Sequence, residues 1–328
     1  MPMNIIHVNQ VRKQYQNHLA LNDVSFDIEK GSIFGLLGPN GAGKTTFIRI
    51  LTMITAPDSG YILFNNERLD RHNIADIGYL PEERGLYKKM KVGEQALYLA
   101  RLKGLDRDTA MAELKKWFIK FDITSWWDKK VEELSKGMAQ KIQFITTIIH
   151  HPKVLIFDEP FSGFDPVNAS ILKQEIINQR NNGATIVFST HNMESVEELC
   201  DSIVLINNAN IVLDGKVKDI KQQFGTSLYN FDIEMFDDYN QTIVDEMKHK
   251  VDDCLIKDGH LSGNISLDKY LGESYSNTIV SDKHLKAEAT NMIVNDLVKI
   301  GNIVTFNEVL PTMNDIFIKT VTANKEEK

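Results

Sequence analysis

Residues 38–45 constrain this chain more than any other stretch, because they match a pattern that binds phosphate groups. They read Gly-Pro-Asn-Gly-Ala-Gly-Lys-Thr and fit G-x-x-x-x-G-K-[ST]. A loop that wraps phosphates turns its backbone N–H groups inward, and glycine permits those turns. The apolar run 33–37 predicts a buried strand before the loop, and residues 46–51 predict a helix after it. The N-terminus of that helix adds partial positive charge beneath the phosphates.

We therefore predict a nucleotide site here. In such a loop Lys44 places its charge on the terminal phosphates, and the Thr45 hydroxyl is a candidate Mg²⁺ ligand. The candidate contacts of the nucleotide are Gly38, Pro39, Asn40, Gly41, Ala42, Gly43, Lys44, Thr45 and Thr46.

A second motif ends in two acids. Residues 154–157 are apolar and predict a buried central strand, and Asp158 and Glu159 follow at its carboxyl end. Ligands of open α/β sheets sit at that edge. Asp158 is a candidate Mg²⁺ ligand, and Glu159 is a candidate base that orients or deprotonates an attacking water. In isolation, two acids at a solvated strand end would need no function, but a phosphate-binding loop upstream makes that interpretation improbable.

Three further positions are weaker candidates when they are considered singly. His191 follows the apolar run 185–189 and would emerge at the same sheet edge, where it could sense a terminal phosphate. Tyr15 precedes the phosphate-binding loop and could stack on adenine, although ordinary packing explains a lone aromatic. Ser135 has the chemistry of an N-cap for a helix running to Ile149, and a plain capped helix explains this stretch by itself.

Composition describes an ordinary globular chain. With 328 residues and 42% hydrophobic residues, it can build one large domain or two. The net charge of −8 gives no global field that attracts nucleic acid or an anionic membrane. Cys200 and Cys254 lack metal-site spacing, so we expect buried free thiols of a reducing cytosol. No apolar run reaches membrane-spanning length and the start resembles no signal peptide, so we expect a chain that neither crosses a membrane nor is exported.

Taken together, the motifs resemble the nucleotide-binding domain of ATP-binding cassette (ABC) proteins over about residues 3–224. The ordered set is more specific than any single motif. It comprises Tyr15 at the adenine-stacking position, Gly38–Thr45 as Walker A, the signature with Leu134, Ser135, Lys136, Gly137 and Gln140, Val154–Glu159 as Walker B, Ser162 and Asp165 of the D-loop, and His191 as the switch histidine.

The resemblance implies a P-loop α/β fold with an antiparallel β subdomain and a helical subdomain, about residues 82–150. It implies ATP and Mg²⁺ as ligands, with Glu159 and His191 as the catalytic residues. It also implies a head-to-tail dimer, formed with a second copy or a paralogous ATPase subunit. In that dimer, Ser135 and Gly137 contact the γ-phosphate bound by the other subunit. Where the family usually has a Q-loop glutamine, this chain has Glu82, a third candidate near the metal.

The run 80–87, Leu-Pro-Glu-Glu-Arg-Gly-Leu-Tyr, resembles a bacterial export-type subgroup that is sodium- or drug-efflux-like and has an extra C-terminal domain. That resemblance implies the ATPase subunit of an exporter on the cytoplasmic face of the membrane, with an integral-membrane permease as partner and no nucleic acid. The alternative is a soluble ABC ATPase of translation or DNA repair, but such proteins usually have two cassettes, a coiled coil or a zinc insertion. A non-hydrolysing scaffold is disfavoured because Glu159 and His191 are both present.

We place the domain limits at 1–224 and 225–328. In the second domain, residues 229–235 and 303–309 predict strands, and 285–300 and 314–321 predict helices. This indicates a small α+β domain of ferredoxin-like type with an accessory dimerisation or regulatory role. We expect the polar stretch 236–284 to be rich in loops.

Overall fold

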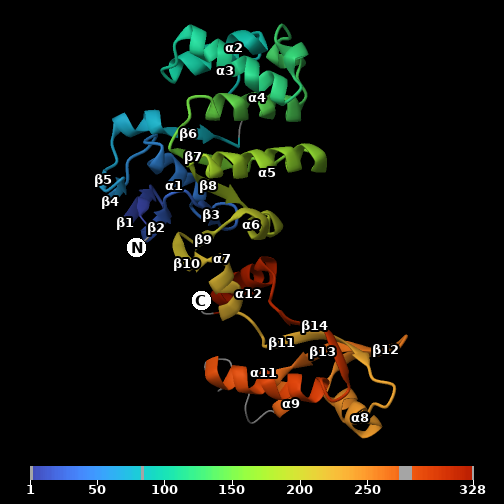
Figure 1. Ribbon diagram of the computed structural model, residues 1–328. Coiled ribbons are helices and arrows are strands. Elements are labelled where there is room, and N and C mark those ends of the chain that lie inside the picture. The colour runs from blue at the N-terminus through green and yellow to red at the C-terminus, as the bar shows by residue number, and fades with distance from the viewer. Residues whose placement is uncertain (1–2, 83–84, 273–282, 327–328) are drawn as a thin grey trace. The chain divides into compact units, whose positions relative to one another are not determined.

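The computed structural model describes residues 3–82, 85–272 and 283–326 (Figure 1). Internal contacts divide the chain into two units. The first comprises the residues up to Val217 and those from Thr320 onward, and the second is Lys218–Lys319. We predicted a boundary between two domains at residues 224 and 225. The two units are defined by contacts alone, so that boundary stays a prediction.

A six-stranded sheet forms the centre of the first unit, in the order β10-β9-β3-β8-β7-β6. The strands β9, β3, β8, β7 and β6 are parallel, and β10 pairs with β9 as an antiparallel hairpin. Every residue of β3, β7 and β8 is buried, which is typical of parallel strands covered on both faces. Their bounds are β3 Ile33–Leu37, β6 Ile77–Leu80, β7 Val154–Asp158, β8 Thr185–Thr190, β9 Ser202–Asn207 and β10 Asn210–Lys216.

Three helices follow strands of this sheet, and two of them begin at a side-chain cap. The phosphate-binding loop leads from β3 into α1 (Lys44–Leu51). Asp165 caps α5 (Pro166–Asn181) by accepting the Asn168 N–H, and proline occupies the first turn of α5, where its missing N–H costs nothing. The third of these helices is α6 (Met193–Leu199), which Asn192 caps by accepting the Ser195 N–H.

A second sheet of the first unit is antiparallel, in the order β2-β1-β4-β5. Phe26 joins it to the central sheet, because its ring stacks on Phe34 of β3 at 5.4 Å and contacts Phe47 of α1 at 5.0 Å between ring centres. The bounds are β1 Asn4–Tyr15, β2 His18–Glu29, β4 Ser59–Phe64 and β5 Glu67–Arg68. A 3₁₀ helix, η1 (Arg71–Asp76), leads from there to β6.

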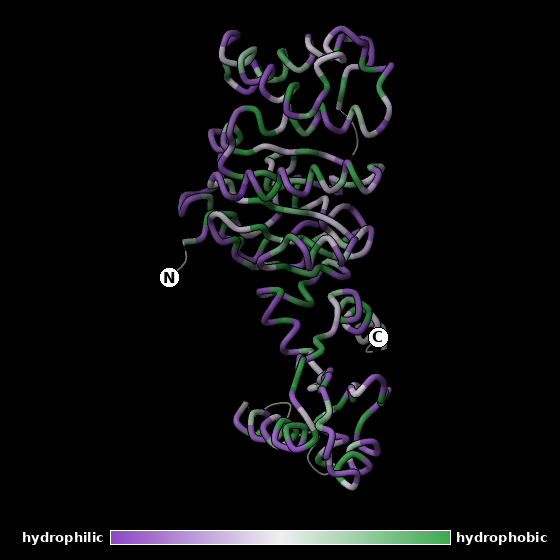
Figure 2. The backbone as a smooth tube through the Cα atoms, turned by 45° about the vertical axis from the view of Figure 1, so that its right-hand side comes forward, coloured by the Kyte–Doolittle hydropathy of each residue, from purple (hydrophilic) through white to green (hydrophobic). Residues whose placement is uncertain are grey.

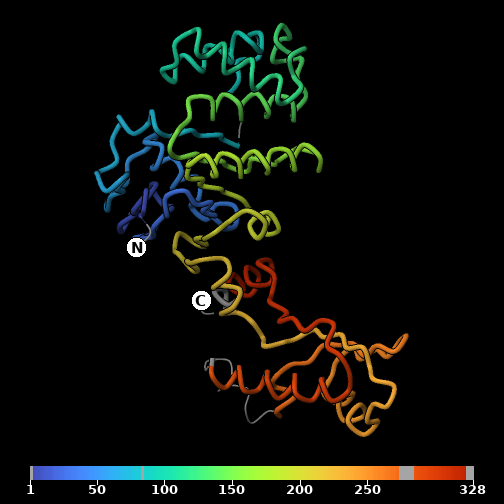
Figure 3. The backbone as a smooth tube through the Cα atoms, in the orientation of Figure 1, coloured from blue at the N-terminus to red at the C-terminus, as the bar shows by residue number. Residues whose placement is uncertain are grey.

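A helical block follows β6 and lies at one end of the unit (Figure 3). Its helices are α2 (Val92–Leu102), α3 (Arg107–Lys120) and α4 (Lys136–Ile148), with the 3₁₀ helices η2 (Thr124–Trp126) and η3 (Val131–Glu133) between α3 and α4. Hydrophilic and hydrophobic residues alternate along these helices (Figure 2), as expected for amphipathic helices around a shared core. Together, the central sheet, the antiparallel sheet and this block confirm the predicted fold class.

The second unit contains a four-stranded antiparallel sheet in the order β12-β13-β11-β14. The chain order is strand, helix, strand, strand, helices, strand, so the unit has the predicted ferredoxin-like arrangement. Its core includes Phe231, Leu261 and Ile293. The bounds are β11 Leu228–Met235, α8 Gln241–Lys250, β12 Asp252–Lys257, β13 His260–Ser266, α9 Leu267–Leu271, α11 Lys283–Leu297 and β14 Gly301–Val309. The chain divides within two further helices, because α7 (Val217–Gln223) begins with the residue Val217 of the first unit and α12 (Met313–Glu326) continues into that unit from Thr320 onward.

Two expectations were wrong. The stretch 236–284 contains α8, β12, β13 and α9, and its residues 273–282 lie outside those described. The stretch is polar because these elements bury few residues: α8 buries just Val244 and Met247, and no residue of β12 is fully buried. Cys200 and Cys254 are both free thiols, as expected, but only Cys200 is fully buried. Within the described residues, no helix has the length and apolar character that a membrane span needs.

A buried carboxylate on α5 forms an ion pair with the helical block of the same unit. Glu175 of α5 has a side chain only 3% exposed and forms an ion pair with Lys120 of α3. Asn178 and Gln179 also donate hydrogen bonds to its two oxygens, at 3.1 and 2.8 Å. A buried charge is tolerated when it is paired and hydrogen-bonded in this way.

We predict that Lys120→Met lowers the free energy of unfolding by about 1–2 kcal/mol, because it leaves the Glu175 charge buried with only neutral donors. Thermal and denaturant unfolding measure this. The matched control is Lys116→Met, which removes an exposed pair with Glu113 on the same helix and should cost about 0.5 kcal/mol or less. Equal losses for the two variants would contradict the assignment.

Candidate functional site

Four neighbouring parallel strands end at one edge of the central sheet. In the register, Leu37 of β3 pairs with Thr190 of β8, Asp158 of β7 pairs with Ser189, and Leu80 of β6 pairs with Phe157. Each pair lies within one residue of the strand ends. The segments that follow these strands therefore leave the sheet side by side.

A pocket of about 210 Å³ lies where these segments meet. It brings together most of the residues predicted to bind the nucleotide, to bind the metal or to act in catalysis. It also adds His18 from the first position of β2, which we did not predict. Tyr15, Gly38, Pro39 and Ala42 are not among the residues that line it. The lining residues are His18, Asn40, Gly41, Gly43, Lys44, Thr45, Thr46, Glu82, Asp158, Glu159 and His191.

Two glycines of the loop are required by both conformation and space. Gly38 and Gly43 have φ angles of +146° and +121°, which side chains rarely adopt. A Cβ atom at Gly38 would stand 2.1 Å from the Ile206 carbonyl oxygen, and one at Gly43 would stand 2.3 Å from the Ala20 carbonyl oxygen. The loop therefore packs against two distant strands, and this fixes its shape before any ligand binds.

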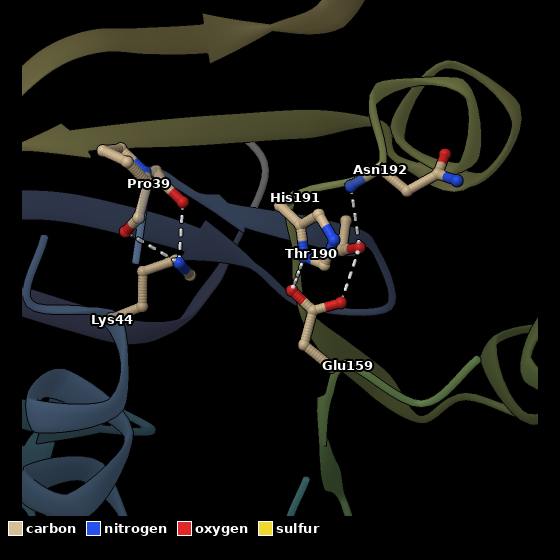
Figure 4. Close-up of polar contacts among 7 residues, drawn as sticks. Pro39, Lys44, Glu159, Thr190, His191 and Asn192 are labelled. Atoms are coloured by element: carbon tan, nitrogen blue, oxygen red, sulfur yellow. Dashed lines mark hydrogen bonds and ion pairs between the residues drawn. The ribbon is translucent and has the colours of Figure 1, made fainter. Parts of the chain in front are cut away.

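Lys44 points back into its own loop (Figure 4). Its Nζ donates hydrogen bonds to the Gly38 carbonyl at 2.7 Å and to the Pro39 carbonyl at 3.2 Å. Burial lowers the pKa of Lys44, while the nearby charges of Glu159, Asp158 and Glu82 act in the opposite direction. The ammonium group is thus held at the floor of the pocket, where a phosphate can replace the two carbonyl partners.

Asp158 is the most deeply buried carboxylate of the pocket, at 5% exposure. Burial raises its pKa, and the charges of Glu82 and Glu159 raise it further, whereas the Ser189 hydroxyl and Lys44 oppose the shift. The ionised form is therefore destabilised in the fold, as expected for a group that awaits a cation.

Glu159 is held in a strained conformation. Its φ is +47°, which is uncommon for a residue with a side chain, and its N–H donates to the Ser189 carbonyl at 2.9 Å. One carboxylate oxygen accepts from the Thr190 hydroxyl at 3.2 Å, and the other lies 2.6 Å from His191 Nδ1 (Figure 4). Sequence reasoning missed Thr190, because a threonine at the end of a buried strand has no distinguishing signal.

Glu82 completes a set of three carboxylates around one lysine. It follows β6, lines the pocket, and acts electrostatically on Lys44 and Asp158. The described residues contain no group of three His, Cys, Asp or Glu placed to hold a metal ion. Mg²⁺ usually binds through one or two carboxylates together with substrate phosphates. The residues therefore fit a magnesium ion that arrives with a nucleotide, with Thr45, Asp158 and Glu82 available to it.

The remaining predicted residues lie outside this pocket. Tyr15 ends β1 opposite His18, is 39% exposed, and has the Lys13 ammonium 5.4 Å from its ring centre. Its role with adenine stays a prediction. In the D-loop, the Ser162 N–H donates to the Glu159 carbonyl at 3.1 Å, so that turn is tied to the strained residue.

The signature residues surround the start of α4. Leu134 directly follows η3, and the Ser135 hydroxyl caps α4 by accepting the Met138 N–H at 3.3 Å. Gln140 donates from Nε2 to the Pro160 carbonyl at 2.9 Å, while its buried Oε1 has no partner among the described residues. This bond ties α4 to the turn that follows the Walker B acids.

Comparison with known proteins identifies the family. A model described as "ABC transporter" matches residues 21–162, and one described as "ATP-binding protein DrrA1-3-like, C-terminal domain" matches residues 215–321. The ABC transporter ATP-binding protein YhaQ of Bacillus subtilis is 47% identical over 221 residues, which cover 67% of this chain and 74% of YhaQ. The chain belongs to the ABC transporter family.

Further relatives agree with this assignment. A solved "ATP binding subunit of ABC transporter" is 31% identical with a TM-score of 0.62, covering 67% of this chain and 93% of that one. The Nod factor export ATP-binding protein I of Burkholderia lata is 33% identical, covering 66% of this chain and 72% of that protein. As a member of the family, the chain is an ATP-binding and ATP-hydrolysing subunit of a transporter, and the alternative in translation or DNA repair is not favoured.

We predict that Asp158→Asn raises stability while it abolishes turnover. The pKa of Asp158 is raised in the fold, so its contribution is favourable at low pH and is lost as the pH rises through the folded-state pKa. Removing the charge should therefore increase the free energy of unfolding at pH 7 by about 1–2 kcal/mol. Thermal unfolding without nucleotide measures this, and the gain should vanish at acidic pH. A lower melting temperature at pH 7 would contradict the prediction.

Proposed function

We propose that this chain is the ATPase of an exporter and works on the inner, cytoplasmic face of the cell membrane. A separate integral-membrane permease would provide the path for the cargo. The observation behind this proposal is the single pocket that gathers Lys44, Glu82, Asp158, Glu159 and His191 from four strand ends. The direction of transport is supported by the Nod factor export relative and by the C-terminal family match.

The pocket supports a site that is shared between two ATPase subunits. Its volume of about 210 Å³ is below the range of about 300–1,000 Å³ that encloses small-molecule ligands. The signature residues Ser135 and Gly137 are absent from its lining, although the family uses them on the γ-phosphate. We therefore infer that a second copy, or a paralogous subunit, covers each ATP with its own α4 N-terminus.

The roles of the residues follow from their contacts. Lys44 exchanges its carbonyl partners for phosphate oxygens. Glu159 is the base that takes a proton from the attacking water, and Thr190 and His191 hold its two oxygens in place. The His191 side chain is 69% exposed, so it could reach the terminal phosphate by giving up its contact with Glu159. A bound Mg²⁺ would neutralise phosphate charge, with Thr45, Asp158 and Glu82 as the residues that hold it.

A groove on the same unit suits the permease partner. Its volume is about 600 Å³, and apolar side chains of Ile74, Leu86, Leu99 and Leu102 line it. Leu102 is 65% exposed at the end of α2. Pro81 lines this groove while the next residue, Glu82, lines the nucleotide pocket. A coupling helix of the permease that docks here would therefore lie one residue away from the site of hydrolysis.

We expect Glu159→Gln to retain ATP, to hydrolyse it at least about 100-fold more slowly, and to accumulate an ATP-bound dimer, because the base is lost while the binding surface is kept. Phosphate release and light scattering during size-exclusion chromatography measure these effects. Lys44→Ala is the control and should bind no ATP and stay monomeric. Normal turnover by Glu159→Gln would remove this residue as the base.

We expect Glu82→Gln to strengthen metal-free ATP binding by roughly 10-fold, because one of three negative charges facing the phosphates is removed. With excess Mg²⁺, the affinity of Glu82→Gln for ATP should equal that of the parent protein or fall below it. Fluorescent-nucleotide titrations in EDTA and in Mg²⁺ compare the two conditions. Identical titrations for the variant and the parent protein would show that Glu82 has no part in the metal dependence.

A further inference from the structure

An apolar pocket lies beside α3 in the helical block, separate from the nucleotide pocket and from the groove proposed for the permease. Its volume is about 540 Å³, within the range of about 300–1,000 Å³ that is typical of sites for small molecules. It shares no lining residue with the other two cavities. The lining residues are Met111, Lys115, Phe118, Ile119, Thr124 and Trp127.

One face of α3 supplies four of these six side chains. Positions i, i+4, i+7 and i+8 of a helix share a face, and in α3 they are Met111, Lys115, Phe118 and Ile119. The 3₁₀ helix η2 and the residue after it, Trp127, follow α3 and supply the rest. The sequence therefore places one cation within an otherwise apolar face.

Trp127 forms a wall that is fixed before any ligand binds. Its ring meets the ring of Phe118 edge-on, with 5.2 Å between the ring centres. A Cβ atom at Gly93 of α2 would stand 2.3 Å from Cε2 of Trp127, so glycine is needed there to leave room for the indole. The Gly93 N–H also donates to the Trp127 carbonyl at 2.9 Å. A wall held by two helices lowers the cost of ordering the site when a ligand binds.

The mouth of the pocket combines exposed apolar surface with a cation. Ile119 is 71% exposed, the highest value for a large apolar residue in the part of the chain that the structure describes. Lys116 is paired with Glu113, whereas Lys115 forms no ion pair with any described residue. Lys115 therefore has an ammonium group available to an anion that also has an apolar part.

We propose that this pocket binds a free long-chain carboxylic acid, with its carboxylate on the Lys115 ammonium and its acyl chain against Phe118 and Trp127. Burial of the chain removes hydrocarbon from water, and the lysine selects an anionic head group. The Thr124 hydroxyl is a second polar group of the lining and can donate a hydrogen bond. The lining contains no acid, so a cationic amphiphile would find no partner. The site needs one chain only, and it depends neither on the proposed dimer nor on the direction of transport.

The test measures binding of decanoate and of 1-decanol to the chain by isothermal titration calorimetry, without nucleotide and below the micelle concentration of decanoate. The parent protein should bind one decanoate, about 10-fold more tightly than the neutral 1-decanol, because only the acid gains a charge-assisted hydrogen bond. Lys115→Gln should weaken decanoate about 10-fold and leave 1-decanol within about twofold of the parent. Ile119→Glu should weaken both ligands at least about 10-fold, because it places a carboxylate in the apolar wall.

The matched control is Lys116→Gln, which removes the same charge from the next position of α3, outside the pocket. Its affinity for decanoate should equal that of the parent protein. Thermal unfolding should show that all variants are folded, since Lys115, Lys116 and Ile119 are exposed. Hydrolysis of MgATP by Lys115→Gln should also equal that of the parent.

Three results would overturn the proposed acid site while the proposed function stands. The first is equal binding of decanoate by Lys115→Gln and Lys116→Gln, which would show that the stem of Lys115 only covers apolar surface. The second is binding of several molecules per chain that Ile119→Glu leaves unchanged, which is adsorption outside the pocket. The third is sedimentation with phosphatidylglycerol vesicles that Lys115→Gln abolishes, without binding of decanoate, which would assign the site to a bilayer lipid. A parent protein that binds decanoate but hydrolyses no ATP would count against the proposed function alone.

Discussion

The parallel register of β3, β8, β7 and β6 is the constraint on which the site depends. Each of these strands ends at the same edge of the sheet, so the phosphate-binding loop, His191, the Walker B acids and Glu82 come together although they are far apart in sequence. Backbone hydrogen bonds fix this arrangement, and buried side chains on β3, β7 and β8 stabilise it. The loops can therefore differ in sequence while their starting points stay fixed.

The site itself is made of features that a stable fold would avoid. Asp158 is a buried carboxylate whose pKa is raised, Lys44 is a buried amine whose pKa is lowered, and Glu159 has a positive φ. Each costs folding free energy, and the cost is tolerated because the surrounding sheet holds them in place. The same features prepare the pocket for a ligand that brings phosphate charge and a metal ion.

The sequence predicted the strands and helices of the first unit more accurately than those of the second. Fully apolar runs such as 33–37 and 154–157 mark buried strands, and the structure has strands there. The loop prediction for the stretch 236–284 was wrong because its elements bury few residues. α8 and β13 bury one face each and β12 buries none, which leaves few apolar residues in any short window. The ferredoxin-like type was nevertheless predicted, and the strand order β12-β13-β11-β14 came only from the structure, because pairing joins strands that are far apart in sequence.

The sequence by itself determined the chemistry: a phosphate-binding loop, two acids after a buried strand, a histidine after another, and the glutamate at position 82 where glutamine is usual. Only the tertiary structure decided which side chains contact one another. Thr190 and His191 hold Glu159, His18 joins the pocket, and Trp127 packs against Gly93. These contacts join residues from separate elements, and they depend on strand order and register, which are properties of the whole sheet rather than of any short segment.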